Sequence, residues 1–130
     1  MSADRPVSPA PKLASAVLEW SELPPKSTPV GERRDFVDGP TATFANFECH
    51  ATTLNPGEAP HGAHQHADEE VIIVKDGVVE VTINGRSRPA GPGSLVFIAS
   101  NDLHGLRNTS AARATYHVLR IVPRDLVTGS

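Results

Sequence analysis

The sequence has one cysteine and no long apolar segment, and each shortage excludes a class of protein. Cys49 is the only thiol among 130 residues, so no disulfide can form within the chain, which is typical of a reducing compartment. Apolar runs such as Val71 to Val74 are far too short to cross a bilayer. Met1 to Leu13 lacks the apolar stretch of a signal peptide and is broken by prolines. We therefore expect a cytoplasmic protein without a membrane partner, a pattern that a mature exported chain with a new start Met would share.

Positive charge is scarce as well. The formal net charge is -3, and the basic residues are scattered, with no run longer than Arg33-Arg34. Nucleic acids and anionic membranes are bound by a basic face, so neither is an expected partner. A chain of 130 residues has room for one domain. A small molecule is the partner that these features leave.

Prolines divide the first part of the chain into segments. Residues 1–12 are mostly Pro, Ala and Ser, which predicts a disordered tail. Residues 13–35 form an N-terminal arm whose apolar residues gather between Val17 and Leu23, ahead of Pro24, Pro25 and Pro29. Such residues need a surface to cover, either on the same barrel or on a partner subunit. We predict a homodimer with Trp20 buried at or near the subunit contact, and an arm folded back on its own chain is the alternative.

Residues 36–130 have the pattern of an all-β domain. Segments of alternating or continuous apolar residues are separated by turn signals such as Asn55-Pro56-Gly57, Asp76-Gly77 and Asn84-Gly85. Short strands at regular spacing with no convincing helix indicate a β-sandwich or barrel. The expected strands are Thr43–Leu54, Val71–Lys75, Val78–Ile83, Ser94–Ala99 and Ala114–Val122.

Histidines gather just before the second of these strands. His61, His64 and His66 precede the acidic run Asp68 to Glu70. In an extended segment, His64, His66 and Glu70 would share one face because residues two apart point the same way. Imidazoles with a carboxylate form a ligand set for a first-row divalent metal. Asp68 or Glu69 could replace Glu70 on composition alone, but strand parity with the apolar residues that follow points Glu70 inward.

Two spaced motifs resemble those of the cupin superfamily. Gly57 to Gly77 reads G-x6-H-x-H-x3-E-x6-G, with one extra residue before the histidine pair, and Gly93 to Asn108 reads G-x5-A-x-N-x2-H-x3-N. The second motif has Ala99 and Asn101 where the family has Pro and Gly, and Asn tolerates the left-handed backbone that Gly would supply. The resemblance implies a small single-domain conserved barrel, that is, a double-stranded β-helix or jelly roll. It also implies one metal ion held by His64, His66, Glu70 and His104.

Three further histidines are candidates for the lining of a pocket. His61 could line the mouth of the site, whereas His50 and His117 lie on expected strands and face either the cavity or the outside. Parity places Glu48, His50 and Thr52 on one face, which would supply polar groups to a substrate if that face is internal. The corner Gly91-Pro92-Gly93 lacks the setting of a phosphate loop, so no nucleotide cofactor is expected.

Three functions are compatible with such a site. The ligand set accepts Fe, Mn, Co, Ni, Cu or Zn and leaves two positions for water, substrate or dioxygen. A dioxygenase-type oxidoreductase is the first hypothesis, on the frequency of that activity in the resembled family. A redox-neutral isomerase, lyase or cyclase acting on a sugar or small acid is the second, and a non-catalytic small-molecule binding protein is the third. The third is disfavoured because sensor proteins of the resembled family usually carry a DNA-binding domain, and no helix-turn-helix pattern accompanies the barrel. The sequence predicts no catalytic residue beyond the ligands.

Overall fold

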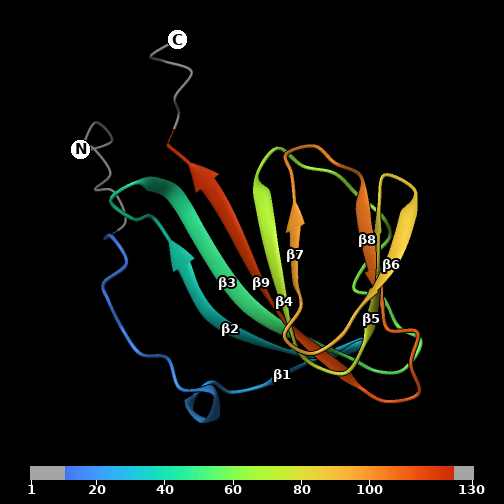
Figure 1. Cartoon of the computed structure of the whole chain (residues 1–130). Coiled ribbons are helices and arrows are strands. Elements are labelled where there is room, and N and C mark those ends of the chain that lie inside the picture. The colour runs from blue at the N-terminus through green and yellow to red at the C-terminus, as the bar shows by residue number, and fades with distance from the viewer. Residues whose placement is uncertain (1–10, 125–130) are drawn as a thin grey trace, which may run out of the picture.

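The computed structural model describes residues 11–124, which fold into two facing antiparallel sheets. Within these residues a six-stranded sheet has the order β1-β2-β3-β9-β4-β7, and a three-stranded sheet has the order β6-β5-β8. The long strands β2, β3 and β9 curve together on one side, and β5, β6 and β8 lie on the other (Figure 1). The elements are η1 (Trp20–Glu22), β1 (Lys26–Thr28), β2 (Gly31–Gly39), β3 (Phe44–Leu54), β4 (Glu69–Asp76), β5 (Val79–Ile83), β6 (Arg86–Ala90), β7 (Leu95–Ile98), β8 (His104–Arg107) and β9 (Ala114–Pro123).

The five strands expected from the sequence are present as β3, β4, β5, β7 and β9. The strands that the pattern missed are short, polar or at a sheet edge. In β2 the consecutive charges Glu32 to Asp35 hide the alternation, so the expected start of the barrel at Phe36 falls inside this strand. The edge strand β6 contains Pro89, which a central strand would exclude. The predicted tail, residues 1–12, lies outside the described residues except for Pro11 and Lys12.

The core lies between the two sheets and is built from alternate residues of the strands. In β4 the inward positions Glu70, Ile72 and Val74 are buried. Alternation buries one side of each strand because successive side chains point to opposite faces. The contiguous core cluster comprises Leu54, Ile72, Val74, Val79, Val81, Ala90, Leu106, Ala114, Tyr116 and Val118.

Two turn positions depend on backbone that most residues avoid. Gly77 has φ +79°, and a Cβ there would lie 2.7 Å from the carbonyl oxygen of Arg113, so the turn between β4 and β5 requires glycine. Asn101 has φ 65°, the left-handed conformation expected at this position of the second motif. The departure from glycine at Asn101 therefore keeps the turn that leads into His104.

Asn108, the last residue of the second motif, ties the end of β3 to the loop between β8 and β9 from a fully buried position. Its amide donates to the carbonyl oxygens of Leu54 at 3.0 Å and Ala112 at 2.8 Å. Its side-chain oxygen accepts from the backbone N–H of Ser110 at 3.0 Å. A buried amide with all of these partners stabilises the end of the barrel that follows β8.

The N-terminal arm packs on the outer face of its own six-stranded sheet. The Trp20 ring lies 6.3 Å from Phe36 and 5.8 Å from His117 between ring centroids. The Arg34 guanidinium lies 4.4 Å from the centre of the Trp20 ring, and its Nη1 donates to the carbonyl oxygens of Trp20 and Leu23. The chain thus adopts the alternative weighed for the arm, with Trp20 on its own barrel. No helix between residues 11 and 124 is long and apolar enough to span a membrane.

Candidate metal centre

Three of the four predicted ligands bring a nitrogen atom to one point inside the barrel. The available nitrogens of His64, His66 and His104 all lie within 4.8 Å of one another. His104 is on β8, and His64 pairs with it by two backbone hydrogen bonds of 2.9 Å. The segment before β4 is therefore a loop with one β-bridge and not the extended strand expected from the spacing. Convergence comes from the loop folding across β8, because the bridge holds the two histidines side by side.

The ring orientation of His66 and His104 is fixed by the backbone. Nδ1 of His66 donates to the carbonyl oxygen of Asp68 at 2.8 Å, and Nδ1 of His104 donates to that of Asp102 at 2.9 Å. This leaves each Nε2 as the ring nitrogen that a metal ion could bind. Both Nε2 atoms are buried and have no hydrogen-bond partner among residues 11–124. Buried acceptors without a partner are costly, and a bound cation would satisfy both.

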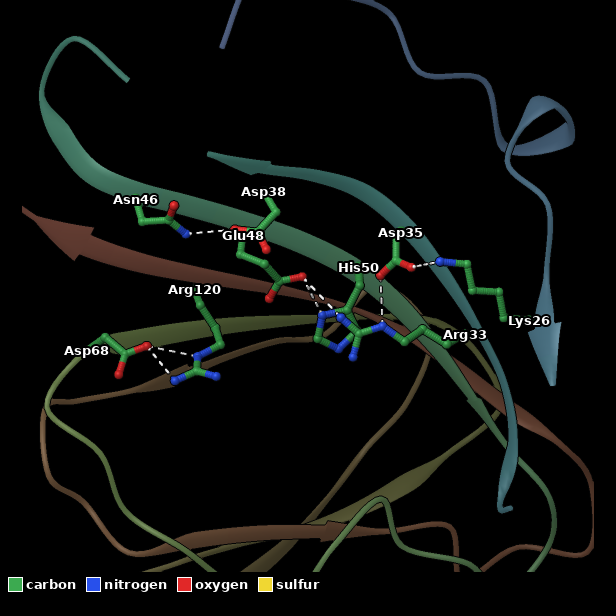
Figure 2. Close-up of polar contacts among 9 residues, drawn as sticks. All are labelled: Lys26, Arg33, Asp35, Asp38, Asn46, Glu48, His50, Asp68 and Arg120. Carbon is green, nitrogen blue, oxygen red and sulfur yellow. Dashed lines mark hydrogen bonds and ion pairs between the residues drawn. The ribbon is translucent and has the colours of Figure 1, made fainter. Parts of the chain in front are cut away.

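Glu70 is the acidic residue that faces these nitrogens. Its side chain is on β4, and the residue is only 7% exposed. Its Oε1 lies 3.3 Å from Nε2 of His66 and 3.8 Å from Nε2 of His104. Asp68 lies 3.2 Å from Nδ1 of His66, not at its Nε2, and is bound by Arg120 through two contacts of 2.8 Å (Figure 2), while Glu69 is exposed. The carboxylate favoured by parity is therefore the one beside the histidines.

His64 is held in the form that can bind a metal. Burial, followed by the nearby charges of His61, His104 and His66, lowers the pKa of His64 from 6.5 to about 4. Its imidazole is neutral at pH 7 and offers a lone pair. The His61 ring lies 4.0 Å from that of His64 between centroids, and His61 itself is exposed.

His64, His104 and Glu70 line a cavity of about 390 Å³ between the sheets. His50, Thr52 and His61 line it, so the face shared by His50 and Thr52 is internal. His117 does not line it. The neighbours Tyr116 and Val118 point inward, which turns His117 outward against Trp20.

Most of the remaining cavity wall is apolar. Its aliphatic lining comprises Val30, Ile72, Val81, Ile98, Leu106 and Val118. Tyr116 adds a hydroxyl, and burial raises the pKa of Tyr116 well above its usual range, so this group stays a hydrogen-bond donor. The wall suits a small molecule with a substantial apolar part.

Two arginines that sequence reasoning left without a role also line the cavity. Arg33 comes from β2 and Arg120 from β9. Arg120 has the same strand parity as Tyr116 and Val118, which is the signal that could have placed it inside. Arg33 could not be found in this way because it lies in the run of charges that hid β2.

The structure is a jelly-roll barrel in which three histidines and a buried glutamate surround one point, an arrangement suited to a divalent metal. The chain belongs to the cupin family, because the model of the cupin domain matches residues 50–120, more than half of its length. This confirms the family resemblance and the fold expected from the two motifs.

Individual relatives are distant in sequence. Protein SchB from Streptomyces halstedii is 24% identical over 110 residues, which are 83% of this chain and 80% of that protein. An RmlC-like cupin from Shewanella frigidimarina superposes with a TM-score of 0.69 at 14% identity, covering 86% of this chain and 95% of that chain. The polyketide cyclase RemF from Streptomyces resistomycificus gives 0.68 at 18% identity, covering 86% and 82%. At these identities the two structures show a shared fold.

Proposed function

We propose that the chain is a metal-dependent enzyme that performs redox-neutral chemistry on a small molecule. One observation carries the proposal: two buried Nε2 atoms without partners face the carboxylate of Glu70 beside a cavity. Three imidazoles and one carboxylate suit Fe, Mn, Co, Ni, Cu or Zn. The residues that would hold the ion are His64, His66, Glu70 and His104.

The protein's own contribution is to orient the substrate and to exclude water. A divalent ion bound at these residues would supply a Lewis acid for a substrate oxygen. The aliphatic wall formed by Ile72, Val81 and Val118 would pack on the apolar part of the substrate. The hydroxyl of Tyr116 would donate a hydrogen bond to a second polar group. A substrate with an oxygen atom that can bind the metal and a largely apolar remainder fits this lining better than a free sugar.

The redox-neutral assignment has support from one relative and competes with two alternatives. RemF is named as a polyketide cyclase, a type of activity that needs no net oxidant. A dioxygenase is the second candidate because the same ligand set leaves room for dioxygen beside a chelating substrate. A binding protein without turnover is the third.

Elemental analysis followed by oxygen uptake separates these functions. Protein purified without a metal-binding tag should contain one divalent ion per chain. Screening with β-dicarbonyl, enediol and flavonol-type compounds should give products without oxygen consumption. Substrate-dependent uptake of oxygen would replace the proposal with the dioxygenase. Stoichiometric binding of these compounds without any product would replace it with the binding protein, and metal-free protein would contradict the enzyme assignments.

The predicted homodimer stays a proposal, now with a different contact surface. Ile73 and Leu95 are paired between β4 and β7, as are Val71 and Phe97, and all four point away from the core. Leu95 is 63% exposed and Phe97 is 53% exposed at the sheet edge. We infer that a second copy covers this face, because large apolar side chains grouped on an edge strand invite pairing.

A charge on this face should separate the dimer. We expect Phe97→Glu to give a monomer by light scattering across a concentration series, because a carboxylate cannot be buried there without a partner. The control is Val78→Glu, at a 40% exposed position on the turn before β5, which should leave the mass unchanged. A wild-type protein that is monomeric at high micromolar concentration would show that this face is not an interface. The cytoplasmic location expected from the sequence also stays a prediction.

A further inference from the structure

A glutamate and a histidine on β3 form a hydrogen-bonded pair away from the proposed metal ligands, and the histidine lines the cavity. Nδ1 of His50 lies 2.7 Å from Oε2 of Glu48, and the two side chains are only 13% and 15% exposed (Figure 2). The residues are two apart on one strand, so both point to the inner face. The carboxylate accepts a hydrogen bond from Nδ1–H, so Nε2 is the ring nitrogen whose lone pair is available when the ring carries a single proton.

The Nε2 atom of His50 is available to a ligand. His50 lines the cavity, and among residues 11–124 this nitrogen has no hydrogen-bond partner. It differs from the Nε2 atoms of His66 and His104, which are sealed from solvent and face Glu70. A base that is accessible from an apolar cavity and oriented by a carboxylate has the arrangement used for proton transfer.

A chain of charges holds Glu48 in place. Nη2 of Arg33 lies 3.5 Å from Oε2 of Glu48, and Nε of the same arginine donates to Asp35 at 2.8 Å. Lys26 on β1 binds the other oxygen of Asp35 at 2.8 Å, as Figure 2 shows. These contacts lower the pKa of Asp35 from 3.8 to about 2, so its carboxylate remains charged near neutral pH. The network fixes the carboxylate that in turn fixes the ring of His50.

The strand register places this pair in the same sheet as Glu70, two strands away from that proposed ligand. Glu48 is paired with Arg120, and Arg120 is paired with Glu70, so the two carboxylates lie two strands apart in one row. His50 is in the next inward row, paired with Val118. Two strand spacings amount to roughly 10 Å. A substrate held beside Glu70 by an oxygen atom would present a more distant atom to His50.

We propose that His50 is a catalytic proton-transfer residue of this cavity and that Glu48 is its positioning residue. This proposal rests on the proposed redox-neutral function and deepens it. In the step, Nε2 of His50 takes a proton from a C–H or O–H group, and the electron pair of the broken bond stays on the substrate. The same proton then returns to a different atom, which gives an isomerised or ring-closed product. No oxidant or reductant is needed, because the electrons remain within the substrate.

The test uses a probe whose reaction reports a base in an apolar cavity. In 5-nitrobenzisoxazole the base removes the ring C–H proton, the electron pair forms the nitrile, and the N–O bond breaks to release a coloured phenolate. We expect the protein as purified to accelerate this reaction above free imidazole at equal concentration. His50→Gln should lower kcat by about tenfold or more, because the base is lost while a side chain of similar length remains.

The positioning role of Glu48 gives a separate signature. Glu48→Gln keeps the shape of the side chain but removes its charge, so kcat should fall on the order of tenfold while KM stays the same. In NMR spectra of the imidazole nitrogens, His50 should carry its proton on Nδ1 in the wild type and lose this preference in Glu48→Gln. A merely structural contact would move neither kcat nor the tautomer. The matched controls are His117→Gln on the outer face and the exposed Glu80→Gln on β5.

Each outcome decides between the proposals. Wild-type turnover in His50→Gln, no acceleration by the wild type, or an unchanged tautomer in Glu48→Gln would overturn the role of the pair. Metal content is measured on the same samples and should not change in His50→Gln. A His50-dependent reaction in protein that binds no metal would overturn the proposed metal-dependent function and leave the pair standing.

Discussion

Replacing His104 with alanine should remove most of the bound metal. The variant loses one of four proposed ligands, and the remaining imidazoles cannot replace it because the ring orientation of His66 is fixed by its own backbone contact. Changing groups that only support a ligand already costs 10- to 100-fold in metal affinity, so we expect a loss of about 100-fold or more here. The measurement is metal content by elemental analysis after dialysis, with circular dichroism to verify the fold.

The control for this variant lies in the same stretch of sequence. His61→Ala should keep its metal, since His61 is exposed and its Nδ1 already contacts the carbonyl oxygen of Gly62 at 2.9 Å. His66→Ala should behave like His104→Ala because its Nε2 is the other buried nitrogen without a partner. A folded His104→Ala protein with one metal ion per chain would contradict the four-ligand assignment.

Chelation should lower the melting temperature without unfolding the barrel. A ligand that binds only the folded state stabilises it by about 4 kcal/mol when its free concentration is a thousandfold above Kd. For a domain of this size that corresponds to roughly 10 °C or more in Tm. The barrel should persist because its core is the apolar cluster around Leu54, Val74 and Val79, which contacts no metal. Calorimetry with and without chelator measures the difference.

Acid should remove the same stabilisation. The bound form needs unprotonated imidazoles, so proton competition weakens metal binding as the pH falls through the histidine range. His64 adds to this trend: its folded pKa is lowered, so the unfolded chain takes up its proton first and stability is lost as the pH falls from 6.5 toward about 4. The gap in Tm between metal-loaded and chelated protein should close over this range. Complete unfolding on chelation at neutral pH would make the site structural instead.

The local part of the site could be predicted from the sequence because turn chemistry and strand parity are local properties. Asn101 adopts the left-handed backbone expected of it, and Glu70 lies on the inward face with Ile72 and Val74. The family motifs then placed His104 beside the first cluster, although His104 is far from that cluster in sequence.

The rest of the site depends on contacts that no local pattern contains. Parity could not say whether His50 or His117 faces the cavity, since this depends on which face of β3 and β9 meets the second sheet. The sequence showed that Trp20 needs a surface to cover but not which one, and in the structure Trp20 packs against Phe36 and His117 of its own chain. Arg33 needed a strand that its charged neighbours concealed.

The most direct test of the account is anomalous diffraction from crystals of the protein, collected at the absorption edge of the metal found by elemental analysis. The account predicts one strong peak per chain, between the Nε2 atoms of His66 and His104, a ring nitrogen of His64 and the carboxylate of Glu70. A peak at other residues, or density showing only water among these four side chains in protein that retains stoichiometric metal, would contradict it.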